Sequence, residues 1–162
     1  MSLPFDRSEW FSFDKPADVP CRHLQPTNRC SIHEQLSELG QAGCAHYDCY
    51  GAGQRLTQEL GPGHSWRADP ERAHQVFAAF RQLKTLHELR LLLHEARALG
   101  LAAQHVQELE LLLAQLEPET DFDAEALGKV DVAELERAVH TFLRGLGGYV
   151  TRRRRLPLWP PR

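Results

Sequence analysis

The side chains with the clearest chemical potential lie in one stretch, residues 20–54. All four cysteines of the chain fall within it, at Cys21, Cys30, Cys44 and Cys49. Three of the nine histidines lie between them, at His23, His33 and His46. Thiolates bind zinc tetrahedrally and also hold iron–sulfur clusters, because sulfur is a soft, polarisable donor. A metal site is therefore the first chemistry to consider.

The cysteine spacing, C-x8-C-x13-C-x4-C, leaves other chemistries open. No two cysteines form a C-x2-C pair, so the spacing by itself is not specific for zinc. Cys44 and Cys49 could instead be a redox pair, or the same thiols could hold an iron–sulfur cluster. The cysteines could also be small buried side chains without a ligand.

Composition and charge restrict the class of protein. The chain has 162 residues, 25% of them charged and 42% hydrophobic, which is typical of a globular domain. A net charge of −3 gives no general attraction to nucleic acid or an anionic membrane. No apolar run approaches the roughly 20 residues of a membrane span, and the N-terminus lacks the basic start and apolar core of a secretion signal. We therefore expect a cytoplasmic protein, where thiols bind metals, do redox chemistry or are buried rather than forming structural disulfides.

Two short helices are expected around the cysteines. Ser31 and Glu34 form the S-x-x-E pattern of a helix-capping box, which predicts a helix over residues 31–39 that ends at Gly40. A flexible corner at residues 51–53 is followed by a second predicted helix at 54–59. Residues 1–29 contain four prolines and no sustained periodicity, which indicates an extended arm anchored by its aromatic rings.

Three longer helices are predicted after residue 66. Asp69 followed by Pro70 is a strong helix start, and apolar residues then recur every three or four positions to about residue 99. Similar patterns predict helices over about 102–116 and from Asp131 to about 146. In the first of these helices we expect four side chains to be buried: Phe77, Phe80, Leu83 and Leu93.

The expected fold is mainly α. A cysteine-rich irregular cap with short helices packs on an antiparallel bundle of about three longer helices. Residues 1–66 form the extended arm and cap, residues 67–150 form the helical bundle, and residues 151–162 form a disordered basic and proline-rich tail. The tail holds the four arginines that could contact phosphate groups: Arg152, Arg153, Arg154 and Arg155. We predict no other nucleic-acid contact, no membrane contact and an unidentified protein partner.

The sequence resembles the amino-terminal module of a group of bacterial pentapeptide-repeat proteins. The likeness rests on Cys-Ser-Ile-His at 30–33, Tyr-Asp-Cys at 47–49 and Gly-Ala-Gly-Gln at 51–54, and covers residues 5–100 well. The C-x8-C-S-I-H part is also similar to a segment of the CxxCxxCC zinc/iron-chelating family. In such relatives a cysteine-dense segment comes first and pentapeptide repeats follow, and this sequence has neither, so we expect the middle module alone.

The resemblance implies a metal site made from the four cysteines. Cys21, Cys30, Cys44 and Cys49 would be the ligands, with three histidines in reserve: His33, His46 and His23. His33 is the best placed of these because it follows Cys30 by three residues. We therefore predict a non-enzymatic protein with a structural zinc ion, acting through protein contacts. The alternatives are a redox or iron–sulfur protein and a helical interaction module with metal-free, buried cysteines.

Overall fold

The structure is a computed structural model of the chain and describes residues 3–59, 66–67, 69–116 and 127–150. The predicted mainly-α fold is confirmed. Within the described residues there is no strand beyond two isolated β-bridges. The helical elements, in chain order, are η1 (His33–Gln35, a 3-10 turn), α1 (Ala42–His46), α2 (Ala52–Glu59), α3 (Pro70–Arg97), α4 (Ala103–Leu116) and α6 (Val132–Gly145).

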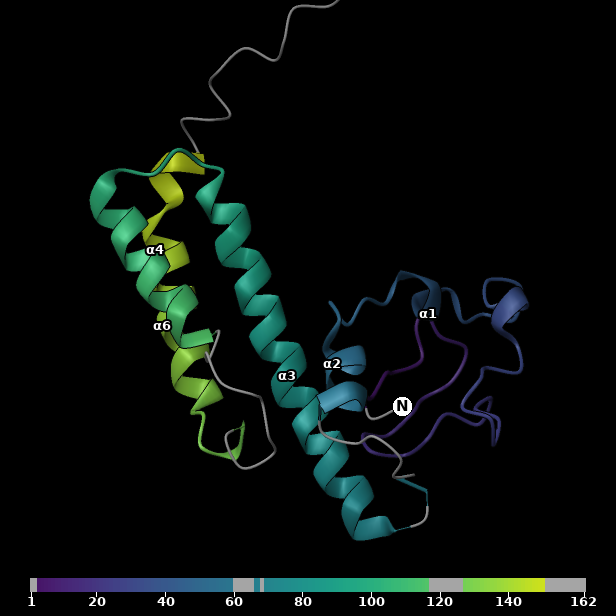
Figure 1. Cartoon of the computed structure of the whole chain (residues 1–162). Helices are drawn as coiled ribbons and strands as arrows, with labels where there is room; N and C mark the ends of the chain where they lie inside the picture. The colour runs from purple at the N-terminus through teal and green to yellow at the C-terminus, as the bar shows by residue number, and fades with distance from the viewer. Residues whose placement is uncertain (1–2, 60–65, 68, 117–126, 151–162) are drawn as a thin grey trace, which may run out of the picture.

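Helix α3 is the element on which the rest of the chain packs. Its start is the one predicted: the Asp69 carboxylate accepts a hydrogen bond from the Glu71 amide at 3.0 Å, and Pro70 is the first helical residue. Helices α4 and α6 pack on one side of α3, and α2 packs on the other (Figure 1). The long helix therefore has apolar neighbours on more than one face.

One hydrophobic core joins α2, α3, α4 and α6, which together we call the helical body. Phe77, Leu83 and Leu93 of α3 are buried as predicted, whereas Phe80 is only partly buried at its edge. The other helices contribute the remaining buried apolar residues, chiefly Ala52, Leu56, Leu109, Leu112, Leu113, Leu116, Val139 and Phe142. This core begins at Ala52 and includes no residue nearer the N-terminus that is fully buried.

The predicted start of the last helix is also confirmed. The Asp131 carboxylate accepts a hydrogen bond from the Glu134 amide at 2.9 Å, which satisfies a donor that the helix itself cannot pair. From this start, α6 presents Val139 and Phe142 to the core. Residues 117–126, where a short helix or turn was expected, and the tail at 151–162 lie outside the described residues.

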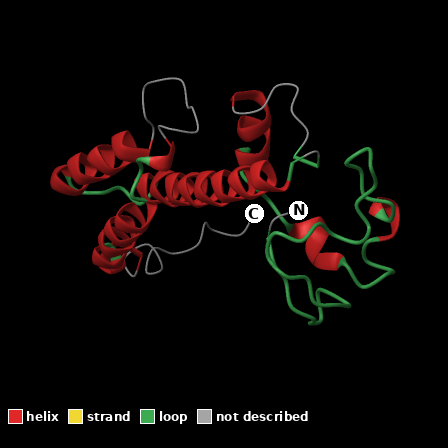
Figure 2. Cartoon of the chain, turned by 90° about the horizontal axis from the view of Figure 1, so that it is seen from below, coloured by secondary structure: helices red, strands yellow, loops and turns green. Residues whose placement is uncertain are grey.

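The N-terminal region, residues 3–50, is built differently. It consists mostly of loops with short helical turns, and lies beside α2 and α3 (Figure 2). Its described residues include only two that are buried, Lys15 and Gln41, and both are polar. Aromatic contacts replace a core: the Phe5 and Phe11 rings stack at 4.1 Å, and Phe13 meets Phe5 edge-on at 5.2 Å.

Backbone hydrogen bonds hold the arm of this region around α1. Phe5 and Lys15 pair through both of their backbone groups, at 3.1 and 2.7 Å. The Ser12 amide donates to the Gly40 carbonyl at 2.7 Å, and the Gly43 amide donates to the Trp10 carbonyl at 3.1 Å. The predicted aromatic arm is therefore wrapped around the N-terminal region itself.

The helix predicted over residues 31–39 is wrong in extent. Only the 3-10 turn His33–Gln35 forms, and its first turn has no side-chain cap. The reason lies with Ser31, whose amide donates to the His23 carbonyl at 2.8 Å in a loop pairing that a helix start would disrupt. The predicted stop is present, since Gly40 has a φ of +68°, which favours glycine.

Polar contacts connect the N-terminal region to the helical body. Asp18 forms an ion pair with Arg81 of α3, and the Tyr50 carbonyl lies 2.7 Å from the His87 Nδ1 atom. Near the start of α3, Arg67 donates to the Gln25 carbonyl at 2.8 Å. These contacts fix the position of the N-terminal region with little apolar burial.

Candidate functional site

A tight loop positions the first two cysteines. Leu24 and Cys30 form an isolated antiparallel bridge, and the Leu24 amide donates to the Cys21 carbonyl at 2.9 Å. The loop reverses near Asn28, whose positive φ of 61° is tolerated by asparagine. Cys21 and Cys30 therefore lie on the two arms of one hairpin-like loop, although eight residues separate them in sequence.

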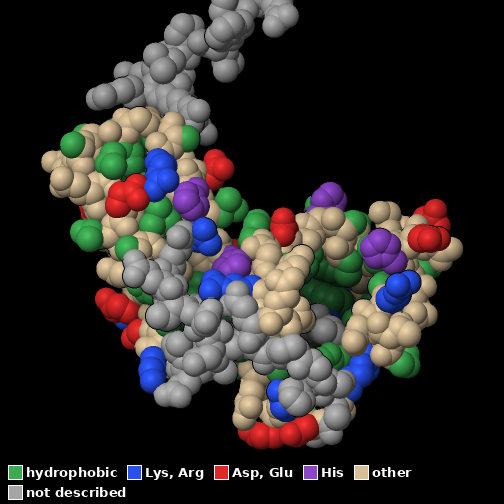
Figure 3. All heavy atoms as spheres, in the orientation of Figure 1, with side chains coloured by type: hydrophobic (Ala, Val, Ile, Leu, Met, Phe, Trp, Pro, Cys, Tyr) green, Lys and Arg blue, Asp and Glu red, His purple; other side chains and the backbone are tan. Residues whose placement is uncertain are grey.

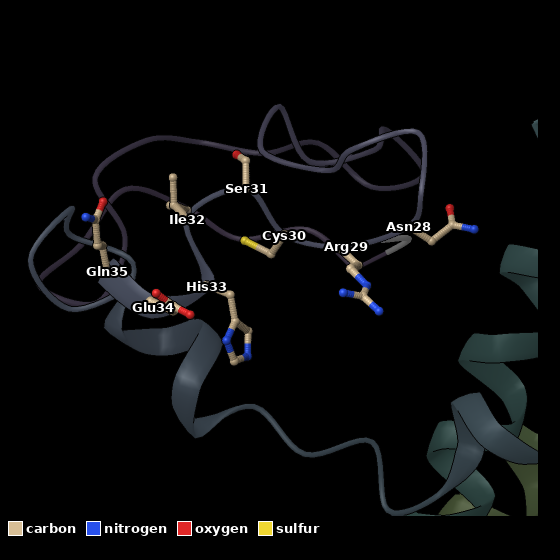
Figure 4. Close-up of a pocket in the computed structure, with 8 residues that line it drawn as sticks. All are labelled: Asn28, Arg29, Cys30, Ser31, Ile32, His33, Glu34 and Gln35. Carbon is tan, nitrogen blue, oxygen red and sulfur yellow. The ribbon is translucent and has the colours of Figure 1, made fainter.

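The following turns bring in His33 and Cys44. His33 begins the 3-10 turn directly after the loop, so it lies near Cys30 (Figure 4). Cys44 lies in α1, whose start is fixed by the hydrogen bond from the Cys44 amide to the Gln41 carbonyl at 3.0 Å. Gln41 is itself held, because its side-chain amide donates to the Ser12 hydroxyl at 2.7 Å.

These side chains share one open depression of about 660 Å³. Its lining includes three of the four cysteines and two histidines, namely Cys21, Cys30, Cys44, His23 and His33. A neighbouring depression of about 640 Å³ is lined by residues 28–35, the segment drawn in Figure 4. The cysteine segment thus gathers most of its potential metal ligands on one surface.

Two of the three reserve histidines have other contacts. The His23 ring is tilted against Phe13, with centroids 5.8 Å apart. The His46 ring packs edge-on against Trp10 at 5.1 Å and does not line the depression. His33 is exposed and has no hydrogen bond or ring contact with any other described side chain, which leaves its imidazole available for a ligand.

Cys49 lies apart from the other three cysteines. Its Sγ atom is 3.7 Å from the Gln54 Oε1 atom at the start of α2, and it is absent from the lining of the depression. A side-chain carbon added at Gly53 would lie 3.7 Å from that sulfur and 3.8 Å from the Phe80 ring. Cys49 therefore packs at the junction of α2 and α3.

Electrostatics also connects the three clustered thiols. Partial desolvation, and then the neighbouring thiols of Cys21 and Cys30, raise the pKa of the Cys44 thiol above its ordinary value of 9.0. Without a cation, the three groups therefore resist being thiolates together. A bound metal ion would reverse this preference, because it stabilises the deprotonated form.

Lys15 is a buried cation beside this cluster, and the sequence analysis did not identify it. Its Nζ atom donates to the carbonyls of Leu3 at 2.6 Å and Pro16 at 3.1 Å. Desolvation lowers the pKa of Lys15, while the charges of Cys21 and Asp18 act in the opposite direction. No pattern in one sequence distinguishes this lysine from an exposed one, because its burial comes from the folding of the arm.

The described residues contain no group of three or more histidine, cysteine, aspartate or glutamate side chains already arranged to hold a metal ion. They contain no disulfide either, as all four cysteines are free thiols. The three thiols and His33 are of the right chemical types for zinc, so they fit a metal in kind. Binding would require them to move closer around the ion.

A second surface feature lies where the N-terminal region meets the helical body. A groove of about 360 Å³ is lined by Tyr50, by Leu91 and Leu92 of α3 and by His140 of α6, among others. The surface is hollowed between the two parts in Figure 3. Separately, no helix in the described part of the chain is long and apolar enough to cross a membrane.

Comparisons with known proteins give one relative. The chain is 37% identical over 160 residues to "Uncharacterized protein YybG" of Bacillus subtilis (strain 168), a match that covers 99% of this chain. It covers 57% of the relative, so the chain spans a little over half the length of that protein. No family model matches the chain, and no solved structure matches it at a significant level.

Proposed function

We propose that this chain is a non-enzymatic module whose N-terminal region is stabilised by a zinc ion bound to its cysteine thiolates. The observation that supports this best is the shared depression lined by Cys21, Cys30 and Cys44. In this proposal the metal gives the N-terminal region one defined shape, and the module acts through contacts with another protein.

The energetics of the N-terminal region support the need for a metal. Ordering each residue costs roughly 1–2 kcal/mol of backbone conformational entropy, which burial of apolar surface normally offsets. In residues 3–50 the only buried side chains are those of Lys15 and Gln41. A structural zinc ion contributes apparent binding energies of order 10 kcal/mol, and this becomes folding energy because the unfolded chain has no site.

The resemblance stated above points in the same direction. Similarity to the amino-terminal module of pentapeptide-repeat proteins, and to the CxxCxxCC zinc/iron-chelating family, implies a chelating role for the cysteine segment. We propose on this basis that the chain belongs with such modules. The printed name of the relative in Bacillus subtilis assigns no activity.

Metal analysis of protein purified without oxygen tests this proposal. We expect about one zinc per chain by elemental analysis and no visible absorption. Iron together with visible absorption would instead support the iron–sulfur alternative. If the protein contains neither metal, and does not take up zinc when it is supplied, the cysteines only pack and the zinc proposal fails.

A change at the site provides the matching variant. Replacing Cys30→Ser should remove the bound zinc, because the thiolate is the ligand and a hydroxyl is a much poorer one. Ser31→Ala, one residue along the same loop, should leave the zinc content unchanged. Equal zinc contents in the two variants would place the metal elsewhere.

A further inference from the structure

The cysteine positions divide the four thiols into a group of three and a separate one. Cys21, Cys30 and Cys44 line the same depression, although they come from two loop arms and from α1. Cys49 follows Cys44 by only five residues, yet its sulfur faces Gln54 and Phe80. Sequence proximity therefore does not predict which thiols can share an ion.

A fourth ligand is available on the same surface. Zinc in structural sites is almost always four-coordinate, and three cysteines with one histidine is a common set. His33 lines the depression three residues after Cys30, and its ring makes no contact with another described side chain. His23 is less suitable because its ring already packs against Phe13.

The surrounding charge matches a site with three thiolates. Zn²⁺ with three thiolates and one neutral imidazole has a net charge of about −1, whereas four thiolates give about −2. The ammonium group of Lys15 is buried beside the cluster and interacts with Cys21. One buried cation offsets one excess negative charge, in the manner of an outer-shell partner of a metal site.

We propose that the metal is held by Cys21, Cys30, Cys44 and His33, and that Cys49 is a free thiol at the junction of α2 and α3. This inference rests on the proposed function, since it assigns the ligands of that site. It replaces the four-cysteine set expected from the sequence by three cysteines and one histidine.

Cobalt substitution of the full chain tests the assignment. Co²⁺ occupies tetrahedral zinc sites, and the intensity of its thiolate charge-transfer band follows the number of bound thiolates. We expect a tetrahedral spectrum with the intensity of three thiolates in the unchanged protein and in Cys49→Ser. Replacing Cys44→Ser should instead weaken Co²⁺ binding by more than about 100-fold, since even a lost outer-shell partner costs about 10–100-fold.

A gain of intensity provides a sharper measurement than a loss. His33→Cys should raise the charge-transfer band by about one third, because a fourth thiolate replaces the imidazole. The matched control is His46→Cys, which adds a cysteine on the same segment but outside the depression and should leave the spectrum unchanged. An increase with His46→Cys, or none with His33→Cys, would overturn the assignment of His33.

Alkylation of the unchanged protein avoids any doubt about the folding of variants. With zinc present, Cys21, Cys30 and Cys44 should be alkylated at least tenfold more slowly than after zinc removal, while the rate for Cys49 should change less than about twofold. Protection of Cys49 by zinc would overturn the ligand assignment and leave the proposed function intact. Failure of the protein to bind either zinc or cobalt would overturn both.

Discussion

The helical body and the N-terminal region of this protein are held by different interactions. In the body, leucine, phenylalanine and valine side chains from four helices are buried against one another. In residues 3–50 the buried side chains are Lys15 and Gln41, and stacked rings, backbone hydrogen bonds and polar links to α3 take the place of a core. A region of this kind needs an additional constraint, whereas the body does not.

The largest expected effect separates the two regions directly. Removing the proposed zinc with a strong chelator should eliminate a stabilisation of order 10 kcal/mol from the N-terminal region. Hydrogen exchange should then show faster exchange at amides such as those of Ser31 and Gly43, with protection in α3, α4 and α6 retained. Unchanged exchange in residues 3–50 would mean that packing alone holds them.

The second prediction concerns the core of the body. Leu83 is 0% exposed, so Leu83→Ala should lower the free energy of unfolding by about 2–5 kcal/mol through lost burial and a new cavity. Leu111, which is 67% exposed on α4, is the control, and Leu111→Ala should change stability by less than about 0.5 kcal/mol. Urea unfolding of both variants measures the difference, and equal midpoints would contradict the packing described here.

A glycine pair compares packing in the two regions. A side-chain carbon at Gly43 would lie 2.3–2.8 Å from the Phe11 ring, which cannot easily move because it stacks on Phe5. Gly43→Ala should therefore cost about 1–3 kcal/mol, seen as faster hydrogen exchange near α1.

The matching change at Gly53 should have the opposite sign. The nearest atoms to an added carbon there are at 3.7 and 3.8 Å, which is ordinary contact distance. Gly53→Ala should therefore stabilise α2 by up to about 1 kcal/mol, because alanine is the better helix former. If both variants shift stability in the same direction, the close approach of Phe11 to α1 is incorrect.

A smaller effect is expected at the link between the regions. Arg81→Gln removes the ion pair with Asp18 and should cost about 0.2–1 kcal/mol, with the loss shrinking at high salt. Arg137→Gln breaks the Arg137–Glu134 pair within α6 and serves as the control. Only Arg81→Gln should speed hydrogen exchange in residues 3–50, and a similar response in both variants would argue against this link.

The smallest effect is a titration at the same junction. Desolvation, and then the nearby charges of Cys49, Glu88 and Asp48, raise the pKa of Tyr47 from 10.0 to about 12. Because the folded pKa is higher than the unfolded one, this stabilisation is complete below pH 10 and is lost as the pH rises to about 12. A tyrosinate absorbance step near pH 12 should disappear in Tyr47→Phe and persist in Tyr50→Phe. Its persistence in Tyr47→Phe would assign the step to another tyrosine.

Much of the helical body could be predicted from local sequence signals. Asp69 and Asp131 cap their helices as expected, and three of the four α3 side chains expected to be buried are buried. These predictions succeed because caps and apolar periodicity act over one or two turns of chain. The capping pattern at Ser31 fails because the Ser31 amide pairs with the distant His23 carbonyl, which no local rule anticipates.

The sequence by itself determined the mainly-α fold and the segment that carries the thiols. Helix periodicity and cysteine content are properties of neighbouring residues, so they can be read before any folding is known. Only the tertiary structure decided that Cys49 lies apart from Cys21, Cys30 and Cys44, and that Lys15 is buried beside them. Those facts depend on how a loop, a turn and an aromatic arm meet in space, since few local interactions fix the relative positions of residues so far apart in the chain.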